Sequence, residues 1–198
     1  MLILATDTSL PILSVALIGD AQLLGASAVE GRSSRNEKLL PAIDWLLSET
    51  GSDRRDIDLF AVTRGPGSFT GVRIGLATMQ GMALALGKPV CAMSTHEAIA
   101  PAHGRWLLID DAGRSEFYVS VFDAGQEVMP PRLARAEDLV SFGAEKLFVA
   151  DFLRERNVAL ACARRAEKIV VGGRIGDYID ITPIYVRLAE AEVKLKQK

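Results

Sequence analysis

The chain has 198 residues, 49% of them hydrophobic, and a formal net charge of −2 at neutral pH. This length suits one large domain or two small lobes with a substantial core. A protein that binds nucleic acid alone normally carries a basic excess, which this composition lacks, so a role on nucleic acid is expected to need a partner protein.

The first third of the chain predicts a three-stranded antiparallel meander followed by a helix. Apolar runs at 2–6, 12–18 and 23–29 are separated by turn residues and predict the strands. Leucine and isoleucine then recur at helical spacing between residues 39 and 47, and Gly51 is a plausible end for this helix. Pro41 is expected to bend its first turns.

The next segment predicts a mixed sheet with helical crossovers. A strand at 59–63 leads through a glycine-rich turn into a helix at 71–86, and a further strand follows at 89–93. The sequence Ser-Thr-His-Glu at 94–97 is a capping-box pattern and predicts a short helix.

The second half repeats the opening of the chain. A strand at 106–109 ends in Asp110 and Asp111, and a turn with Gly113 leads to a strand at 117–122, as the strands around Asp7 do near the start. This echo predicts two related lobes, at 1–100 and 101–198. Further helices are expected at 137–142 and 158–166, and strands at 147–150 and 169–171. A closing helix at 188–196 has the option of packing back on the first lobe.

The glycine-rich turn between strand and helix has two interpretations. Its residues Gly65, Gly67, Ser68 and Gly71 surround Pro66. Such a turn either aims free N–H groups at an anion or lets the helix pack closely on the sheet. The turn fits neither the Walker A nor the dinucleotide-binding pattern.

Ionisable residues give little support for catalysis. Asp7 and Asp110 or Asp111 end the first strand of each lobe and either face a cleft, where they could hold magnesium through water, or accept N–H bonds in their turns; we favour the turns. The two histidines, His96 and His103, form no metal-ligand pattern, so no metal site and no catalytic residue are expected. Cys91 and Cys162 stand in apolar surroundings and are expected to be buried thiols.

The two long helices of the first lobe predict a partner surface, because they carry more apolar and small residues than one sheet face needs to cover. The residues expected at this interface are Leu39, Ile43, Leu46, Gly75, Thr78 and Met82. The start of the chain has no basic signal-peptide region, and no apolar run is long enough to span a membrane, so a cytoplasmic location is expected.

Four stretches together resemble the TsaB (YeaZ) family: residues 3–9, the glycine-rich element 65–75, residues 110–118 and the C-terminal 183–187 with Ala191 and Glu192. The resemblance implies an α/β fold of two RNase H-like lobes of the actin/Hsp70/sugar-kinase type, with the second lobe shortened. It implies a non-catalytic role in making threonylcarbamoyladenosine in tRNAs that read codons starting with A.

The same resemblance implies the partners. The paralogue TsaD carries the metal-binding histidines and transfers the threonylcarbamoyl group, and the ATPase TsaE joins the complex. The chain itself would require no cofactor, although ATP or ADP could bind at the complex interface, and tRNA would be reached only through the complex. A homodimer could form without TsaD.

The sequence departs from the family at two places, and other functions compete. Arg35 and Asn36 stand where the family commonly has His-Ser, and the middle of the second lobe is short. The alternatives to a non-catalytic partner are an active ATPase or phosphotransferase on the same fold, or a peptidase. The short second lobe argues against a complete adenosine pocket, and no metal set or nucleophile supports a peptidase.

Overall fold

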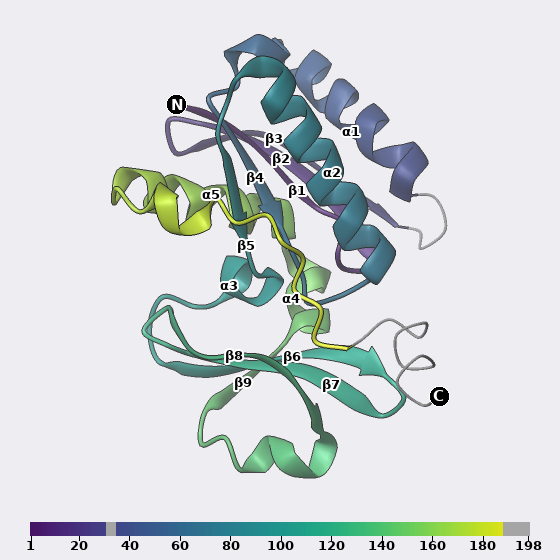
Figure 1. Cartoon of the computed structure of the whole chain (residues 1–198), viewed down its shortest axis with the longest axis vertical. Helices are drawn as coiled ribbons and strands as arrows, with labels where there is room; N and C mark the ends of the chain where they lie inside the picture. The colour runs from purple at the N-terminus through teal and green to yellow at the C-terminus, as the bar shows by residue number, and fades with distance from the viewer. Residues whose placement is uncertain (31–34, 188–198) are drawn as a thin grey trace.

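The computed structural model describes residues 1–30 and 35–187, which form two β-sheets, the first of them covered by helices on both faces (Figure 1). The first sheet has the strand order β3-β2-β1-β4-β5. Its meander consists of β1 (Leu2–Asp7), β2 (Ile12–Gly19) and β3 (Gln22–Glu30), paired antiparallel. Two more strands, β4 (Leu59–Thr63) and β5 (Val90–Met93), run parallel to β1. The meander and the helical crossovers predicted from the sequence are confirmed.

Helices cover both faces of this sheet. On one face lie α1 (Arg35–Thr50) and α2 (Phe69–Leu86), and on the other lies α5 (Val158–Val171) (Figure 1). Strand β1 is therefore buried on both sides: Ile3 and Ala5 belong to the core beneath α5, whereas Leu4 belongs to the core beneath α1 and α2. A strand covered on both faces reads as a continuous apolar run, as this one does.

The ends of α2 follow from its flanking residues. Ser68 is the N-cap, and its hydroxyl accepts a hydrogen bond from the Gly71 N–H at 3.2 Å. Gly87 ends the helix in the left-handed conformation at φ 65°. Pro41 lies in the interior of α1 with its ring exposed.

The second sheet repeats the order of the first with one strand fewer among the described residues. Its order is β8-β7-β6-β9, with β6 (Arg105–Gly113), β7 (Glu116–Asp123) and β8 (Gln126–Arg135) antiparallel and β9 (Glu145–Phe148) parallel to β6. The repeated lobe predicted from the sequence is thus confirmed. Strand β8 was missed, because Pro130 and Pro131 interrupt its alternation; both lie where the ladder to β7 is irregular.

Several expectations for the second half are wrong. Residues 169–171, expected to be a strand, are the last turn of α5. The strand expected at 147–150 ends at Phe148, where α4 (Val149–Glu155) begins. The helix expected at 137–142 is the 3-10 helix η2 (Ala136–Val140). Two other 3-10 helices are η1 (Arg54–Asp56) and η3 (Ile175–Tyr178). The closing helix expected at 188–196 lies outside the described residues.

The chain crosses between its lobes more than once. The predicted boundary after residue 100 falls between α3 (Thr95–Ile99) and β6, but α5, which follows the second sheet, packs on β1, β2 and β4. Its buried face carries small side chains, among them Ala159, Cys162 and Ala163, which allow close approach to the strands. One apolar cluster consequently extends from the first sheet through α5 to Leu108 and Phe122 of the second.

Within the described part of the chain, no helix is both long and apolar enough to cross a membrane.

Candidate functional site

The glycine-rich turn lies against the turn between β1 and β2. Gly67 has φ 148°, and a Cβ on it would overlap the carbonyl oxygen of Ser9. The Ser68 N–H donates to that same oxygen at 2.7 Å. The turn therefore packs backbone against backbone, and one of its N–H groups is already bonded inside the protein.

The first turns of α2 also pack closely on Thr8, which follows β1. A Cβ on Gly71 would overlap the Thr8 carbonyl oxygen, and one on Gly75 would overlap the Thr8 hydroxyl. That hydroxyl donates to the Gly71 carbonyl oxygen at 2.7 Å. Glycine at both positions thus lets α2 approach β1 closely, which favours the structural interpretation of the turn over anion binding.

The side chain of Asp7 links the turn after β1 to the end of β4. Its side chain is fully buried and accepts hydrogen bonds from the Ser9 hydroxyl at 2.6 Å and the Thr63 hydroxyl at 2.5 Å. Burial raises the pKa of Asp7, and the hydrogen bonds from Ser9 and Thr63 oppose that rise. Because both neighbours bind the carboxyl group, Asp7 acts inside its turn, as we favoured, rather than facing a cleft.

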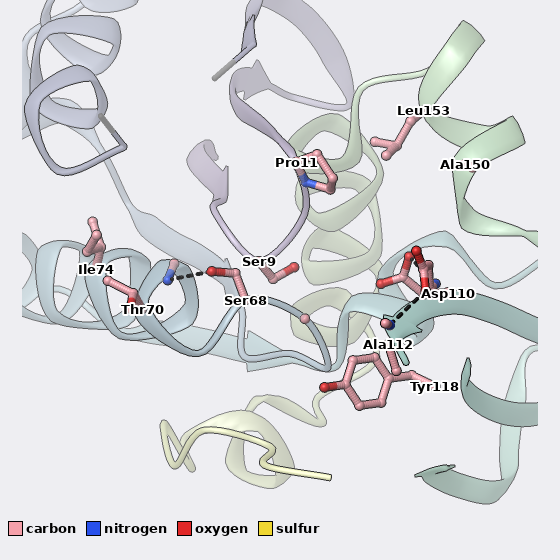
Figure 2. A pocket seen from close by; sticks show the side chains of 14 residues that line it. Ser9, Pro11, Ser68, Thr70, Ile74, Asp110, Ala112, Tyr118, Ala150 and Leu153 are labelled. Carbon is pink, nitrogen blue, oxygen red and sulfur yellow. Dashed lines mark hydrogen bonds between the residues drawn. The ribbon is translucent and has the colours of Figure 1, made fainter. Parts of the chain in front are cut away.

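A cavity of about 810 Å³ separates the two lobes next to these turns. One wall carries Ser9 and Ser68, and the facing wall carries Asp110 and Ala112 (Figure 2). Two residues of α4, Ala150 and Leu153, complete the lining at one end. The turns that follow the repeated strands therefore lie on opposite sides of one cavity. Asp110 and Asp111 of the second lobe line this cavity, whereas Asp7 of the first lobe does not.

Asp110 is the most perturbed group of the lining. Desolvation raises its pKa to about 7, the N–H of Asp111 partly offsets the rise by its hydrogen bond of 3.0 Å, and the charges of Asp7 and Asp111 add to it. The carboxyl group of Asp110 therefore keeps its proton to a higher pH than an exposed aspartate does.

The described lining of the cavity carries no basic side chain. Phosphates are bound in proteins by basic side chains or by free N–H groups. Among the described lining residues there is no lysine or arginine, Asp110 and Asp111 are acidic, and the N–H groups of Ser68 and Gly71 are bonded internally.

His96 is one of the two histidines that are not expected to bind a metal. This residue is fully buried in α3, its Nδ1 lies 2.6 Å from the Ser120 hydroxyl, and desolvation lowers its pKa to about 3. No cluster of three or more histidine, cysteine or acidic side chains is placed for metal binding within residues 1–30 and 35–187. Cys91 and Cys162 are buried free thiols, as predicted.

Most residues predicted at a partner surface are not on the surface. Leu39, Ile43 and Leu46 are at most 1% exposed in the core beneath α1, and Gly75 is buried against Thr8. Their expected exposure is wrong, because the inward stripe of each helix is needed to cover its own sheet.

The two remaining residues, Thr78 and Met82, are half-buried on α2. Sequence reasoning missed the apolar residues that α1 and α2 do expose: Leu40 (50%), Trp45 (52%) and Leu84 (82%). Their only signal is a position outside the inward helical stripe. Small exposed residues accompany them on α2, namely Thr70, Ala77, Gly81 and Ala85. We call this exposed side of α1 and α2 the outer face.

Two RNase H-like lobes, with the order 3-2-1-4 repeated and a cavity between them, define an α/β protein of the actin/Hsp70/sugar-kinase class with a shortened second lobe. A Pseudomonas aeruginosa structure described as YeaZ superposes with a TM-score of 0.72 at 25% identity, covering 93% of this chain and 99% of that one.

Sequence comparisons identify the family. The family model for TsaD, tRNA N6-adenosine threonylcarbamoyltransferase, matches residues 32–161. The TsaB protein of Bacillus subtilis is 28% identical over 98% of this chain and 97% of the relative. The Escherichia coli TsaB protein is 39% identical, but the match spans 54% of this chain and 45% of that relative. The chain belongs to the family of this model and, within it, to the TsaB (YeaZ) group.

The close contact at Gly71 gives a stability prediction. Gly71→Ala is expected to lower the free energy of unfolding by roughly 1–3 kcal/mol, because the added methyl group must displace the Thr8 backbone. Gly81→Ala, in the same helix with open space around it, is the matched control and should raise stability by roughly 0.5–1 kcal/mol. Urea unfolding measures both changes, and equal stabilisation by the two substitutions would contradict the close approach.

The raised pKa of Asp110 predicts a pH dependence. The folded state keeps this proton up to about pH 7, whereas the unfolded chain loses it near 3.8, so Asp110 makes the free energy of unfolding fall as pH rises through this window. Asp110→Asn should therefore stabilise the protein above pH 7, on the order of 1–2 kcal/mol after solvent screening, and the gain should vanish towards pH 4.

Urea unfolding between pH 4 and 8 tests this. The lowered pKa of His96 makes the free energy of unfolding rise with pH, which is the opposite sign. This contribution is the same in parent and variant, so it cancels in their difference. Asp56→Asn, at an exposed carboxylate of η1, is the control. Parent and Asp110→Asn curves that stay parallel over the whole range would show that Asp110 ionises normally.

Proposed function

We propose that this chain is the non-catalytic partner of the threonylcarbamoyltransferase TsaD in the formation of threonylcarbamoyladenosine in tRNAs that read codons starting with A. The B. subtilis and E. coli relatives are named as tRNA threonylcarbamoyladenosine biosynthesis proteins, and the matching family model carries the name of the transferase. These names support a place for the chain in this pathway.

The residues favour a supporting role over transferase chemistry. The chain has two histidines, and one of them, His96, is fully buried with its pKa lowered to about 3. Asp7, which ends the first strand, accepts hydrogen bonds from the Ser9 and Thr63 hydroxyls at Oδ1 and from the Leu10 N–H at Oδ2. His96 and Asp7 are thus occupied in holding the fold together.

The outer face of α1 and α2 is the observation that carries the proposal. Leu40, Trp45 and Leu84 are each at least half exposed there, and exposed apolar groups of this kind usually mark an interface. The small side chains of Ala77 and Gly81 leave room for another helix to approach. We assign TsaD to this face, and in its absence the same face would form an isologous homodimer.

The other components follow from this assignment. TsaE, an ATPase, would join the TsaD-bound form. ATP or ADP would bind where a partner supplies basic groups, because the described lining of the interlobe cavity offers none. tRNA would reach the chain only through the complex, in the cytoplasm, in keeping with the net charge of −2.

Two other functions make different predictions. An ATPase or phosphotransferase of the same fold would turn over ATP as an isolated chain, and a peptidase would cleave peptides. We favour neither, because the described cavity lining is acidic and Asp7 is engaged in its turn.

The isolated chain is therefore expected to leave tRNA unmodified. With tRNA, ATP and the threonylcarbamoyl-adenylate donor, modified adenosine should appear only after TsaD is added, because the transferring groups lie on TsaD. Mass spectrometry of digested tRNA measures the product. Modification by the chain alone, or ATP turnover without partners, would refute the non-catalytic assignment.

The outer face can be tested with a matched pair of substitutions. Leu84→Arg should weaken TsaD binding at least tenfold, a cost of about 1.4 kcal/mol, because a charge would be buried in the interface. Val140→Arg is the control, since Val140 is 78% exposed but lies on η2 in the second lobe. Titration calorimetry measures affinity, and thermal melts check the fold. Undiminished affinity of a folded Leu84→Arg variant would place TsaD elsewhere.

A further inference from the structure

The C-terminal segment 180–187 crosses from the first lobe to the second. After η3, the chain runs past the end of β4 and reaches the hairpin of β6 and β7 (Figure 1). The Ile184 N–H donates to the Arg64 carbonyl oxygen at 2.8 Å, directly before the glycine-rich turn. A Cβ on Gly65 would stand only 3.0 Å from the Ile184 carbonyl oxygen, so glycine permits this contact too.

Side chains of the first lobe hold the segment at two more points. The Arg64 guanidinium pairs with Asp180 at 2.9 Å and also donates to the Thr182 carbonyl oxygen at 3.3 Å. The ring of Tyr185 lies on Phe69, with the ring centroids 4.7 Å apart. Arg73 covers the Phe69 ring at 3.9 Å and donates to the Tyr185 hydroxyl at 2.6 Å.

The second lobe holds the same segment through Arg187. Its guanidinium forms an ion pair with Glu116 and donates to the carbonyl oxygen of Ala112 at 2.9 Å. Both charged side chains of this pair are about one quarter to one third exposed, at 24% and 32%, so water screens the pair less than a surface ion pair. A single residue, Val186, therefore separates the Tyr185 contact on one lobe from the Arg187 contact on the other.

These anchors adjoin the walls of the interlobe cavity. Phe69 and Arg73 belong to the start of α2. Its N-cap Ser68 and its residue Gly71 line one wall, and Ala112 belongs to the facing wall. A short segment fixed on both walls limits how far they can separate, because each residue spans at most about 3.6 Å. We propose that residues 180–187 form a strap that fixes the angle between the two lobes and so the width of the cavity. This inference goes beyond the proposed function and does not depend on TsaD.

The experiment measures the distance between the lobes in the full chain. Spin labels are attached to cysteines introduced at Ser48 of α1 and Lys146 of β9, both exposed. The native thiols stay unlabelled, because Cys91 and Cys162 are fully buried and burial raises the pKa of Cys91 to about 12. The parent protein is expected to give one narrow distance distribution.

Arg187→Ala should broaden this distribution, and Tyr185→Ala should do the same from the other side of the strap. Arg187→Glu should broaden it too, and adding Glu116→Arg should narrow it again in part, because the ion pair is restored with reversed charges. Arg105→Ala is the control: it breaks an exposed pair with Asp123 within the second lobe and should change nothing.

The outcome decides between a strap and a passive tail. A distribution that stays as narrow as in the parent for both Arg187→Ala and Tyr185→Ala overturns the proposal, as does broadening by Arg105→Ala of the same size. If thermal melts show that Arg187→Ala does not fold, Glu116→Gln takes its place, since it removes the charge and keeps the shape; it must broaden the distribution, and an unchanged one counts against the strap.

Discussion

The contact between the glycine-rich turn and the turn after β1 is the constraint on which the rest of the structure depends. Backbone meets backbone there: Gly67 packs on Ser9, and Gly71 packs on Thr8. Asp7 stabilises this contact, because its carboxyl group accepts hydrogen bonds from the hydroxyls of Ser9 and Thr63. This contact sets how closely α2 lies on β1, and therefore which faces of α2 are buried and which remain for a partner.

The same contact gives Asp7 a different role from Asp110. Asp7 ends the first strand of its sheet, and Asp110 lies near the end of the first strand of the other sheet. In the first lobe the glycine-rich turn closes over Asp7, which is fully buried and bonded within its turn. In the second lobe Asp110 instead lines the cavity, and desolvation raises its pKa. One repeat has thus become structural, while the other faces the cavity.

The second lobe is the smaller one, and it is joined to the first by shared packing as well as by the chain. Among the described residues its sheet has the four strands β8-β7-β6-β9, whereas the first sheet has five. The helix α5 follows the second sheet but covers the first, so that the apolar cluster continues from one lobe into the other. The segment 180–187 then returns across both lobes. The halves share a core, and the chain crosses between them before β6, before α5 and again at 180–187, which is more than one flexible linker would provide.

The sequence by itself determined the local elements and the repeat. Apolar period and turn residues located β1 to β5, α1 and α2, because each of these strands and helices carries a continuous hydrophobic signal. The repeated aspartate and turn located the second lobe. The family could be assigned from short motifs, since glycine positions in a tight contact tolerate little change.

Only the tertiary structure decided which apolar residues face outwards. Leu39, Ile43 and Leu46 lie on the buried stripe of α1, whereas Leu40 and Trp45 lie outside it and are exposed. The sequence shows apolar residues at all five positions and does not say which of them a partner could reach. It also decided that β8 pairs despite its prolines, that residues 169–171 finish α5, and that Arg187 reaches Glu116 across 71 positions of the chain. These features depend on contacts between distant segments, which leave no periodic pattern in the sequence.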